Sequence, residues 1–574
     1  MKTLLRYLRP YTRRMSLGLA IKVTGTMVEL FLPYILTHIL QNVVAKERLD
    51  HILLWGGAMI LCAATALVCN IVANRMAARV SRAFSQSVRR DLFARTLRLS
   101  AAQTDRFTIP SLESRITTDT YHVHNFVGMM QRMGVRAPIL LIGGVVITLL
   151  MDPRLALAMI ALLPFIFVTV YFISKKGVPL YTRVQKSVDR MVRIVREDAQ
   201  GIRVIKALSK NDYEHRRYDE ANRALVESEK RAGITMGVVN PIMTLLMNGG
   251  IVLVVALAAV LVADGRSHPE TVIAFMQYFT LISMAMMSVS RIFVMYTKCA
   301  ASAGRIAEVL EAPSDLGVAS EEAYPPIEPA DHIVFRDVSF SYVGRKNDLS
   351  HISFSLPHGG SLGIIGATGS GKSTLIKLLL RFYDVTKGAI YIGGKDLRSI
   401  KKDELYAMFG TAMQQDFLYA DTVEENIRFG RPLSHEAIAT AARIAQAEEF
   451  ITAFPAGYEH QLSSKGTNIS GGQKQRLLIA RSLAADPAIL VLDDSSSALD
   501  YKTDAALRRT LAAERPHTTT ITVAQRVSSV KGCDLILVLE EGEIIGAGRH
   551  EELLTTCQTY KEISDSQMGG AFLE

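Results

Sequence analysis

The first 300 residues contain long apolar segments, whereas the remainder of the chain has shorter apolar runs between polar stretches. Six long segments stand out, at residues 15–40, 53–75, 135–150, 155–174, 235–263 and 271–297. A membrane-spanning helix needs about 20 apolar residues, and the third segment reaches that length by extending back through Met129. The pattern predicts an all-α domain of six transmembrane helices.

The connections between these segments alternate in length and charge. The stretches near residues 76–134 and 175–234 are long and rich in Arg and Lys, whereas those near 41–52, 151–154 and 264–270 are short. Because an excess of basic residues marks the cytoplasmic side, we expect a multi-pass protein of the cell membrane with its N-terminus and C-terminal half in the cytoplasm. Trp55 falls where the second span should meet the outer interface.

The long inner loops keep apolar residues at helical spacing, which predicts helices that continue below the membrane. Their tips, near residues 106–119 and 210–218, are expected to transmit motion to a soluble domain. Residues 311–332 are rich in proline and acidic residues and are interpreted as a linker. The predicted domains are therefore a membrane domain at residues 1–310, the linker at 311–332 and a second domain at 333–574.

The composition argues against several classes of protein. The net charge is +10, but the basic residues concentrate in the inner loops, so we expect no nucleic-acid partner. The five cysteines form no CxxC pair and fit neither a disulfide framework nor a zinc site. The basic N-terminus is not followed by a short apolar stretch with a cleavage site, so no removable signal peptide is expected.

The second domain carries a phosphate-binding motif. Short apolar strands such as SLGIIG and ILVLD alternate with helical patterns, which predicts an α/β domain with a largely parallel sheet. GATGSGKST follows the first of these strands, opens a helix, and matches G-x-x-x-x-G-K-[ST]. The predicted nucleotide-binding residues of this loop are Gly366, Thr368, Gly369, Ser370, Gly371, Lys372, Ser373 and Thr374.

The chemistry of the motif implies ATP with Mg²⁺. Glycine N–H groups at a helix start surround phosphate oxygens, and Lys372 reaches the terminal phosphates. The Ser373 hydroxyl and Asp493, at the end of ILVLD, are the predicted metal ligands. The fold class is thus a six-helix transmembrane domain followed by an α/β P-loop nucleotide-binding domain.

With the SGGQKQR motif at residues 470–476, the whole chain resembles the exporter-type half-transporters of the ATP-binding-cassette family. The resemblance implies that Ser470, Gly471, Gly472 and Gln473 grip the γ-phosphate of ATP bound to a second subunit. It also implies that Tyr342 stacks on adenine. Gln414 is implied as a magnesium and water contact, with the neighbouring Gln415 as an alternative register, and residues 497–500 resemble the loop between two cassettes.

Two positions depart from the family pattern. Asp494 stands where the family has a catalytic glutamate, and Gln525 stands where it has a histidine. A positioned general base contributes about 10²–10⁴-fold, and glutamine cannot carry a positive charge or shuttle a proton. We therefore predict a site that binds ATP but rarely cleaves it. The chain then resembles the degenerate-site subunit of bacterial heterodimeric multidrug exporters, with a partner that carries Glu and His. A slow homodimer is the alternative.

The membrane domain is expected to hold a small amphipathic substrate. Flexible thioethers suit a polyspecific cavity, although they also serve as packing residues. Methionines concentrate in the fifth and sixth spans, at Met236, Met243, Met247, Met276, Met284, Met286, Met287 and Met295. Lys22 and Glu29 are seven residues apart and share a face of the first span, and Gln277 and Asn248 are further cavity candidates.

Three functions remain open from the sequence. The first is an exporter of lipophilic or amphipathic compounds, with membrane lipid around it. The second is a siderophore importer with the same fold, and the third is a regulatory ATP-binding subunit that transports nothing.

Overall fold

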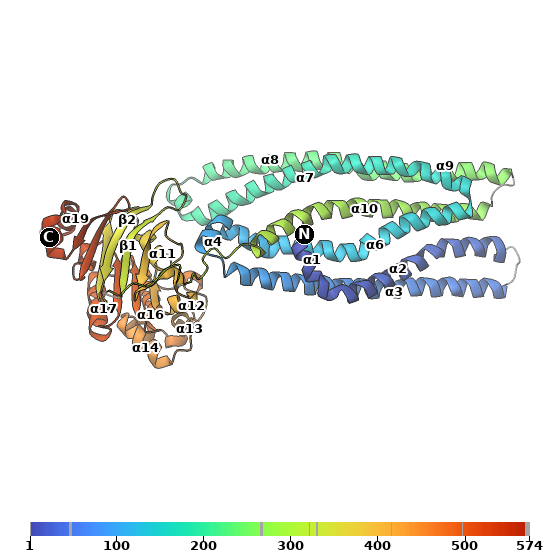
Figure 1. Ribbon diagram of the computed structural model, residues 1–574. Helices are drawn as coiled ribbons and strands as arrows, with labels where there is room; N and C mark the ends of the chain where they lie inside the picture. The colour runs from blue at the N-terminus through green and yellow to red at the C-terminus, as the bar shows by residue number, and fades with distance from the viewer. Residues whose placement is uncertain are drawn as a thin grey trace. The chain divides into compact units, whose positions relative to one another are not determined.

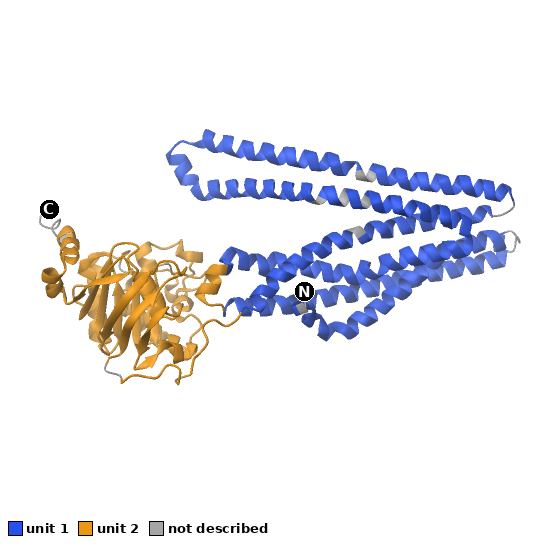
Figure 2. Cartoon of the chain, turned by 45° about the horizontal axis from the view of Figure 1, so that its top comes forward, with its two compact units in different colours: residues 1–98, 107–312 blue, residues 99–106, 313–574 orange. Residues whose placement is uncertain are grey.

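The computed structural model describes residues 2–44, 49–264, 268–320, 322–328, 331–414, 416–495 and 497–568. The chain forms two compact units, which Figure 2 colours separately. Unit 1 contains residues 1–98 and 107–312, and unit 2 contains residues 99–106 and 313–574.

Unit 1 consists of helices joined by short turns in its described residues (Figure 1). Its α-helices are α1 (Lys2–Leu8), α2 (Thr12–His38), α3 (Leu49–Thr96), α5 (Ile109–Ser114), α6 (Thr120–Met151), α7 (Pro153–Ala207), α8 (Asn211–Gly237), α9 (Val239–Ala263) and α10 (Pro269–Leu310). Two π-helical turns, η2 (Ile39–Val43) and η4 (Arg115–Asp119), extend α2 and precede α6.

Five described helical stretches of unit 1 are long and apolar enough to cross a membrane: Thr3–Val43, Leu49–Thr96, Ile109–Met151, Asn211–Ala263 and Pro269–Leu310. Pro153–Thr169, at the start of α7, adds a shorter apolar helix. These six stretches coincide with the six predicted spans, and a helical transmembrane domain is confirmed. At a rise of 1.5 Å per residue, helices α3 (48 residues) and α7 (55 residues) are each far longer than the thickness of a hydrocarbon core, about 30 Å.

The turn between α6 and α7 shows how local sequence sets these boundaries. Asp152 leaves the helical conformation, and its Oδ1 accepts hydrogen bonds from the N–H groups of Arg154 (3.0 Å) and Leu155 (3.4 Å). Pro153 follows as the first residue of α7, where its missing N–H costs no helical hydrogen bond. A tight turn of this kind allows two antiparallel helices to pack directly against each other.

Unit 2 contains two sheets. The six-stranded sheet has the order β10-β9-β3-β8-β7-β6, and all its neighbours are parallel except β9 and β10. Its strands are β3 (Ser361–Gly366), β6 (Phe409–Ala412), β7 (Ile489–Asp493), β8 (Thr519–Val523), β9 (Leu535–Glu540) and β10 (Glu543–Gly548). The predicted parallel α/β sheet is confirmed, and β7 is buried along its whole length, as strands covered on both faces are.

The second sheet is antiparallel and was not predicted. It has the order β2-β1-β4-β5 and consists of β1 (Ile333–Phe340), β2 (Leu349–Leu356), β4 (Lys387–Ile392) and β5 (Lys395–Asp396). Its inner face shares one buried core with β3, β7 and α11. The helices of unit 2 are α4 (Ala101–Phe107), α11 (Lys372–Leu379), α12 (Lys402–Ala407), α13 (Val423–Arg428), α14 (His435–Ile444), α15 (Glu448–Thr452), α16 (Gly471–Leu483), α17 (Tyr501–Glu514), α18 (His550–Thr556) and α19 (Gln558–Met568).

Most of the short helix α4 belongs to unit 2, although the sequence around it belongs to unit 1. Asp105 accepts a hydrogen bond from the hydroxyl of Tyr383. Ser100 Oγ lies 2.6 Å from Asp315 Oδ2, and Gln103 Nε2 donates to the carbonyl of Pro313 at 2.6 Å. Residues 99–106, directly before the first predicted loop tip at 106–119, are therefore part of unit 2. The second, at 210–218, lies in unit 1 at the start of α8.

Candidate nucleotide-binding site

The phosphate loop connects β3 to α11, the strand–loop–helix context that the motif requires. Gly369 has φ +86° and Gly371 has φ +100°, which are left-handed conformations that glycine adopts without steric cost. A Cβ on Gly371 would lie 2.6 Å from Leu349 Cδ2, whereas one on Gly369 would meet no heavy atom within 4 Å. The loop thus combines one glycine that permits close packing with one that leaves open space for a ligand.

Lys372, the first residue of α11, lies across the mouth of this loop. Its Nζ donates to the carbonyls of Gly366 and Ala367, each at 2.7 Å. Burial lowers the pKa of the Lys372 ammonium, and the carboxylates of Asp494 and Asp493 oppose that shift. This partly buried ammonium at the start of a helix is placed where a phosphate oxygen can bind.

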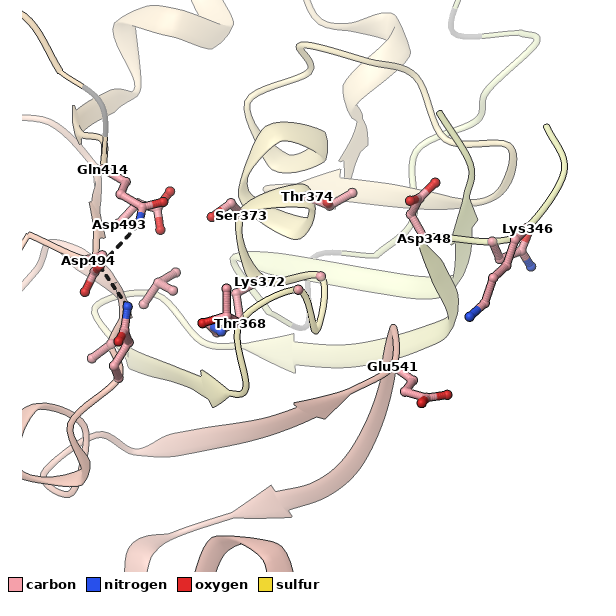
Figure 3. Close-up of a pocket in the computed structure, with 16 residues that line it drawn as sticks. Lys346, Asp348, Thr368, Lys372, Ser373, Thr374, Gln414, Asp493, Asp494 and Glu541 are labelled. Carbon is pink, nitrogen blue, oxygen red and sulfur yellow. Dashed lines mark hydrogen bonds between the residues drawn. The ribbon is translucent and has the colours of Figure 1, made fainter. Parts of the chain in front are cut away.

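Most of the predicted residues line one cavity of about 410 Å³ (Figure 3). Those that line it are Thr368, Gly369, Gly371, Lys372, Ser373, Thr374, Gln414, Asp493, Asp494 and Gln525. Gly366 and Ser370 belong to the same loop but do not line the cavity. Ser370 is 4% exposed, and its carbonyl accepts a hydrogen bond from Gly542 N at 3.2 Å. The structure therefore brings residues from four separate sequence segments into one polar pocket.

Four polar residues of the cavity were missed by sequence reasoning: Lys346, Asn347, Asp348 and Glu541. They belong to two turns, one before β2 and one between β9 and β10, and neither turn carries a motif. Asp348 Oδ2 accepts a hydrogen bond from the N–H of Tyr342 at 2.9 Å. This bond links the turn before β2 to Tyr342, the residue predicted to contact adenine.

Tyr342 does not line the cavity but lies beside it. Its hydroxyl is 3.3 Å from Thr374 Oγ1, and the Lys377 ammonium is 5.6 Å from its ring centroid. Tyr383 meets the ring edge-on at 5.1 Å, and Tyr342 remains 39% exposed. Tyr342 is thus an exposed aromatic ring beside the start of α11, and its stacking on adenine stays a prediction.

Asp493 and Asp494 end β7 at the floor of the cavity. Asp493 is 2% exposed, and the Ser373 hydroxyl lines the same cavity. Burial raises the pKa of both carboxyls. The Ser373 hydroxyl opposes the shift at Asp493, and the amides of Gln525 and Gln414 oppose it at Asp494. Ser373, Asp493 and Gln414 supply hard oxygen atoms, the ligands that Mg²⁺ prefers, so the residues present fit a magnesium-bound nucleotide.

Asp494 is held between two glutamine amides. Its Oδ2 accepts from Gln525 Nε2 at 3.1 Å and from Gln414 Nε2 at 3.4 Å (Figure 3). Its backbone has φ +50°, a left-handed conformation that aspartate tolerates better than most residues. The alternative glutamine, Gln415, lies outside the described residues, and Gln414 is the one placed in the cavity.

The SGGQ segment does not line this cavity. Ser470 caps α16: its Oγ accepts from Gln473 N at 3.2 Å, and Gln473 Oε1 accepts from Ser470 N at 3.0 Å. Within the described residues, no hydrogen bond uses the N–H groups of Gly471 and Gly472. Ser470 and Gly471 are exposed, so the start of α16 has two N–H donors and a positive helix end that are open to a ligand.

Comparison with known proteins agrees with this geometry. Residues 15–286 match the model of the ABC transporter transmembrane region, and residues 349–497 match the ABC transporter model. The uncharacterized ABC transporter ATP-binding protein YfiB of Bacillus subtilis is 34% identical over 571 residues, which cover 99% of both chains. The chain belongs to the ABC transporter family. Rv1273c of Mycobacterium tuberculosis, described in the same words, is 32% identical over 98% of this chain and 97% of its own.

The fold of this ABC transporter subunit is shared with a solved structure titled "Structure of a bacterial Atm1-family ABC exporter with ATP bound". The TM-score is 0.81 at 23% identity, over 96% of this chain and 98% of the other. The chain is thus a half-transporter with a multi-pass membrane domain and a cytoplasmic ATP-binding domain. ABC exporters commonly work as dimers in which ATP hydrolysis is coupled to transport.

The raised carboxyl pKa values give this ABC subunit a testable pH dependence. In the nucleotide-free protein, burial favours the protonated forms of Asp493 and Asp494, so their contribution to stability is present at low pH and is lost as pH rises through the raised pKa values. Mg²⁺ binding requires the ionised forms. We expect the extra thermal stabilisation by Mg-ATP over ATP with chelator to shrink as pH falls from about 7 towards 5. Thermal unfolding across that range measures it, and an Asp493→Asn variant should show a weaker dependence because only Asp494 then titrates.

Proposed function

We propose that this chain is one subunit of a heterodimeric ABC exporter of lipophilic or amphipathic compounds. The chain binds Mg-ATP in a site that hydrolyses it slowly, and its SGGQ segment forms part of the nucleotide site of the partner. The single observation that carries the proposal is the environment of Asp494, where both side chains that hydrogen-bond its carboxylate are amide donors.

The geometry around Asp494 supports weak catalysis. An effective general base must reach the attacking water, and the Asp494 carboxylate is one methylene shorter than glutamate. One of its oxygens already accepts two amide hydrogen bonds, which oppose the rise in pKa that burial causes and occupy positions from which an attacking water would be bound. Gln525 can donate to a phosphate oxygen but has no titratable proton near neutral pH. Every group for nucleotide binding is therefore present, whereas the two groups for water activation are weakened.

The SGGQ segment supports a dimeric arrangement. Its two free N–H donors lie at an exposed helix start, away from the cavity that contains Lys372. An anion bound there would have to come from a second nucleotide-binding domain. A partner with a working glutamate and histidine would then complete one active site with this chain's Gly471 and Gly472.

The membrane domain supports a substrate with an apolar body. Of the methionines in the last two spans, Met243, Met247 and Met286 pack in one apolar cluster of the domain. Met276, Met284 and Met287 are exposed, as are Gln277 and Asn248. The exposed thioethers and amides give an adaptable surface for amphipathic compounds, whereas the first three methionines serve packing.

The decisive experiment compares the chain purified alone with the chain co-purified with its native partner. We expect the chain alone to bind ATP but hydrolyse it slowly, and the pair to hydrolyse it briskly and to accumulate an amphipathic dye in inside-out vesicles. Lys372→Met should abolish nucleotide binding at this chain's site, whereas Lys387→Met, on the exposed part of β4, should not. Brisk ATPase activity of the chain alone would contradict the proposal. Dye movement in the opposite direction would indicate import.

A further inference from the structure

Gln525 lies in a short segment, residues 525–527, that follows the end of β8. We call it the Gln525 segment. The Gln525 amide donates to Asp494 Oδ2 at 3.1 Å. The preceding residue, Ala524, is still bonded to the sheet, because its N–H donates to the carbonyl of Ile364 on β3 at 3.1 Å. Beyond Ala524 the chain leaves the sheet, so groups outside the sheet hold the backbone that carries the Gln525 amide.

The side chain of Gln567, near the end of α19, bonds to both ends of the Gln525 segment. Its Nε2 donates to the carbonyl of Gln525 at 2.8 Å, and its Oε1 accepts from the N–H of Val527 at 2.8 Å. Among the residues that the structure describes, no other group bonds to this carbonyl or to this N–H. Val527 is fully buried, and a buried N–H without a partner costs free energy. One primary amide therefore holds the backbone on both sides of Arg526.

Helix α19, at the C-terminal end of the described chain, is anchored to the same domain (Figure 1). Tyr560 is fully buried, and its hydroxyl lies 2.8 Å from His550 Nδ1. Tyr560 and Ile563 pack in the apolar cluster that contains Val527. Tyr560, Ile563 and Gln567 follow one another at spacings of three and four residues, so they share one face of the helix. The face that packs on the domain is therefore the face that carries Gln567.

Arg526, between the two bonded residues, supports the segment on another side. Its Nη1 donates to the carbonyl of Leu499 at 3.3 Å, and its guanidinium carbon lies 4.8 Å from the centroid of the Tyr501 ring. The Gln525 segment is thus held by α19 and by residues 499–501, while the Gln525 side chain lines the nucleotide cavity.

Gln525 lies at one end of that cavity. Figure 3 shows Asp494, its hydrogen-bond partner, on one side of Lys372, and Asp348 on the other side. Asp348 accepts from the N–H of Tyr342, the residue predicted to contact adenine. Lysine in this motif reaches the terminal phosphates. The end with Gln525 is therefore the end expected to receive the γ-phosphate, which ATP has and ADP lacks.

We propose that Gln567 is a positioning residue of the nucleotide site, through which α19 keeps the Gln525 amide directed at the terminal-phosphate end of the cavity. This inference rests on the proposed binding of ATP at this site. Gln567 does not line the cavity, so it acts on the nucleotide only through the backbone of the Gln525 segment. The C-terminal helix thereby helps the site to prefer ATP over ADP.

The test compares two nucleotides in the full chain assembled with its partner, with nucleotide binding by the partner's own phosphate loop disabled. The probes are adenylyl imidodiphosphate, which is not hydrolysed, and ADP, both labelled on the ribose with N-methylanthraniloyl and both supplied with Mg²⁺. The main variant is Gln567→Ala. Gln567→Glu keeps the size and the bond to the Val527 N–H but places an acceptor against the Gln525 carbonyl. The matched control is Gln558→Ala, at the exposed start of the same helix, where the amide donates to Glu562 at 2.9 Å.

We expect both Gln567 variants to bind the triphosphate analogue about fivefold more weakly, the effect of losing one hydrogen bond between neutral groups, and to bind ADP as before. Gln558→Ala should change neither affinity. In a chain that already carries Gln525→Ala, Gln567→Ala should have no further effect, because both changes remove the same contact to the nucleotide.

Three results would overturn the inference: unchanged binding of the triphosphate analogue in Gln567→Ala, equal weakening of both nucleotides, or an additive loss in the double variant. Equal weakening would indicate that Gln567 only stabilises the domain. Brisk ATP hydrolysis by the chain alone would contradict only the proposed function, because the binding test uses a nucleotide that is not cleaved.

Discussion

Replacing Asp494 by glutamate and Gln525 by histidine together is expected to raise ATP hydrolysis at this chain's own site by about 10²-fold. Glutamate adds the missing methylene, and histidine supplies a titratable ring in place of one of the two amides that hold Asp494 Oδ2. The measurement is single-turnover hydrolysis in the assembled pair, with the partner's own catalytic site disabled, so that all product comes from the site of Lys372.

The single variants separate the two contributions. Asp494→Glu alone should recover part of the rate, and Gln525→His alone should recover little because the carboxylate remains too short. Asp494→Asn is the matched control that keeps the size and removes the charge, and it should leave the already slow rate unchanged or lower. A double variant as slow as the natural chain would contradict our assignment of these two residues as the cause of impaired hydrolysis.

Substituting Gly471 by aspartate is expected to lower the ATPase turnover of the assembled pair by about 10²–10³-fold. A negative side chain at the exposed start of α16 would repel the γ-phosphate that the free N–H groups of Gly471 and Gly472 are proposed to bind. The chain itself should fold normally, because a Cβ on Gly471 meets no heavy atom within 4 Å and an acid in the first helical turn stabilises a helix.

Gly471→Asn serves as the control, since it has the same shape without the charge and should cost less activity. Nucleotide binding at the site of Lys372 in the Gly471→Asp chain should be unchanged, as a labelled ATP analogue would report. Unchanged turnover of the Gly471→Asp pair would contradict the proposal that this helix start completes the partner's site.

The overall fold was largely predictable because hydrophobic patterns report burial directly. The six apolar segments and the buried strand of residues 489–493 each show a period or length that only one kind of element satisfies. The antiparallel sheet of β1, β2, β4 and β5 escaped prediction. β5 has only two residues, and β1 and β2, although eight residues long, have irregular registers with bulges, so they carry no clean alternation of apolar and polar residues.

Site residues could be predicted from the sequence wherever the backbone conformation requires a particular residue type, because a recognisable motif then results. The glycines of the phosphate loop are an example, because positive φ at Gly371 restricts the residue type. Asp348 and Glu541 were missed because they lie in turns that many sequences can form. The pairing of Glu29 with Arg136 was missed for another reason: it joins two helices whose relative register the sequence does not state.

The position of α4 affects how the nucleotide-binding domain can be isolated. A fragment that begins at residue 313 would lack residues 99–106, which pack with that unit. Tyr383 would then lose Asp105 as its hydrogen-bond acceptor, and Asp315 would lose the hydroxyl of Ser100. Such a truncated fragment would therefore expose the surface that residues 99–106 cover in the intact chain. Its melting temperature should be lower than that of the same domain in the intact chain.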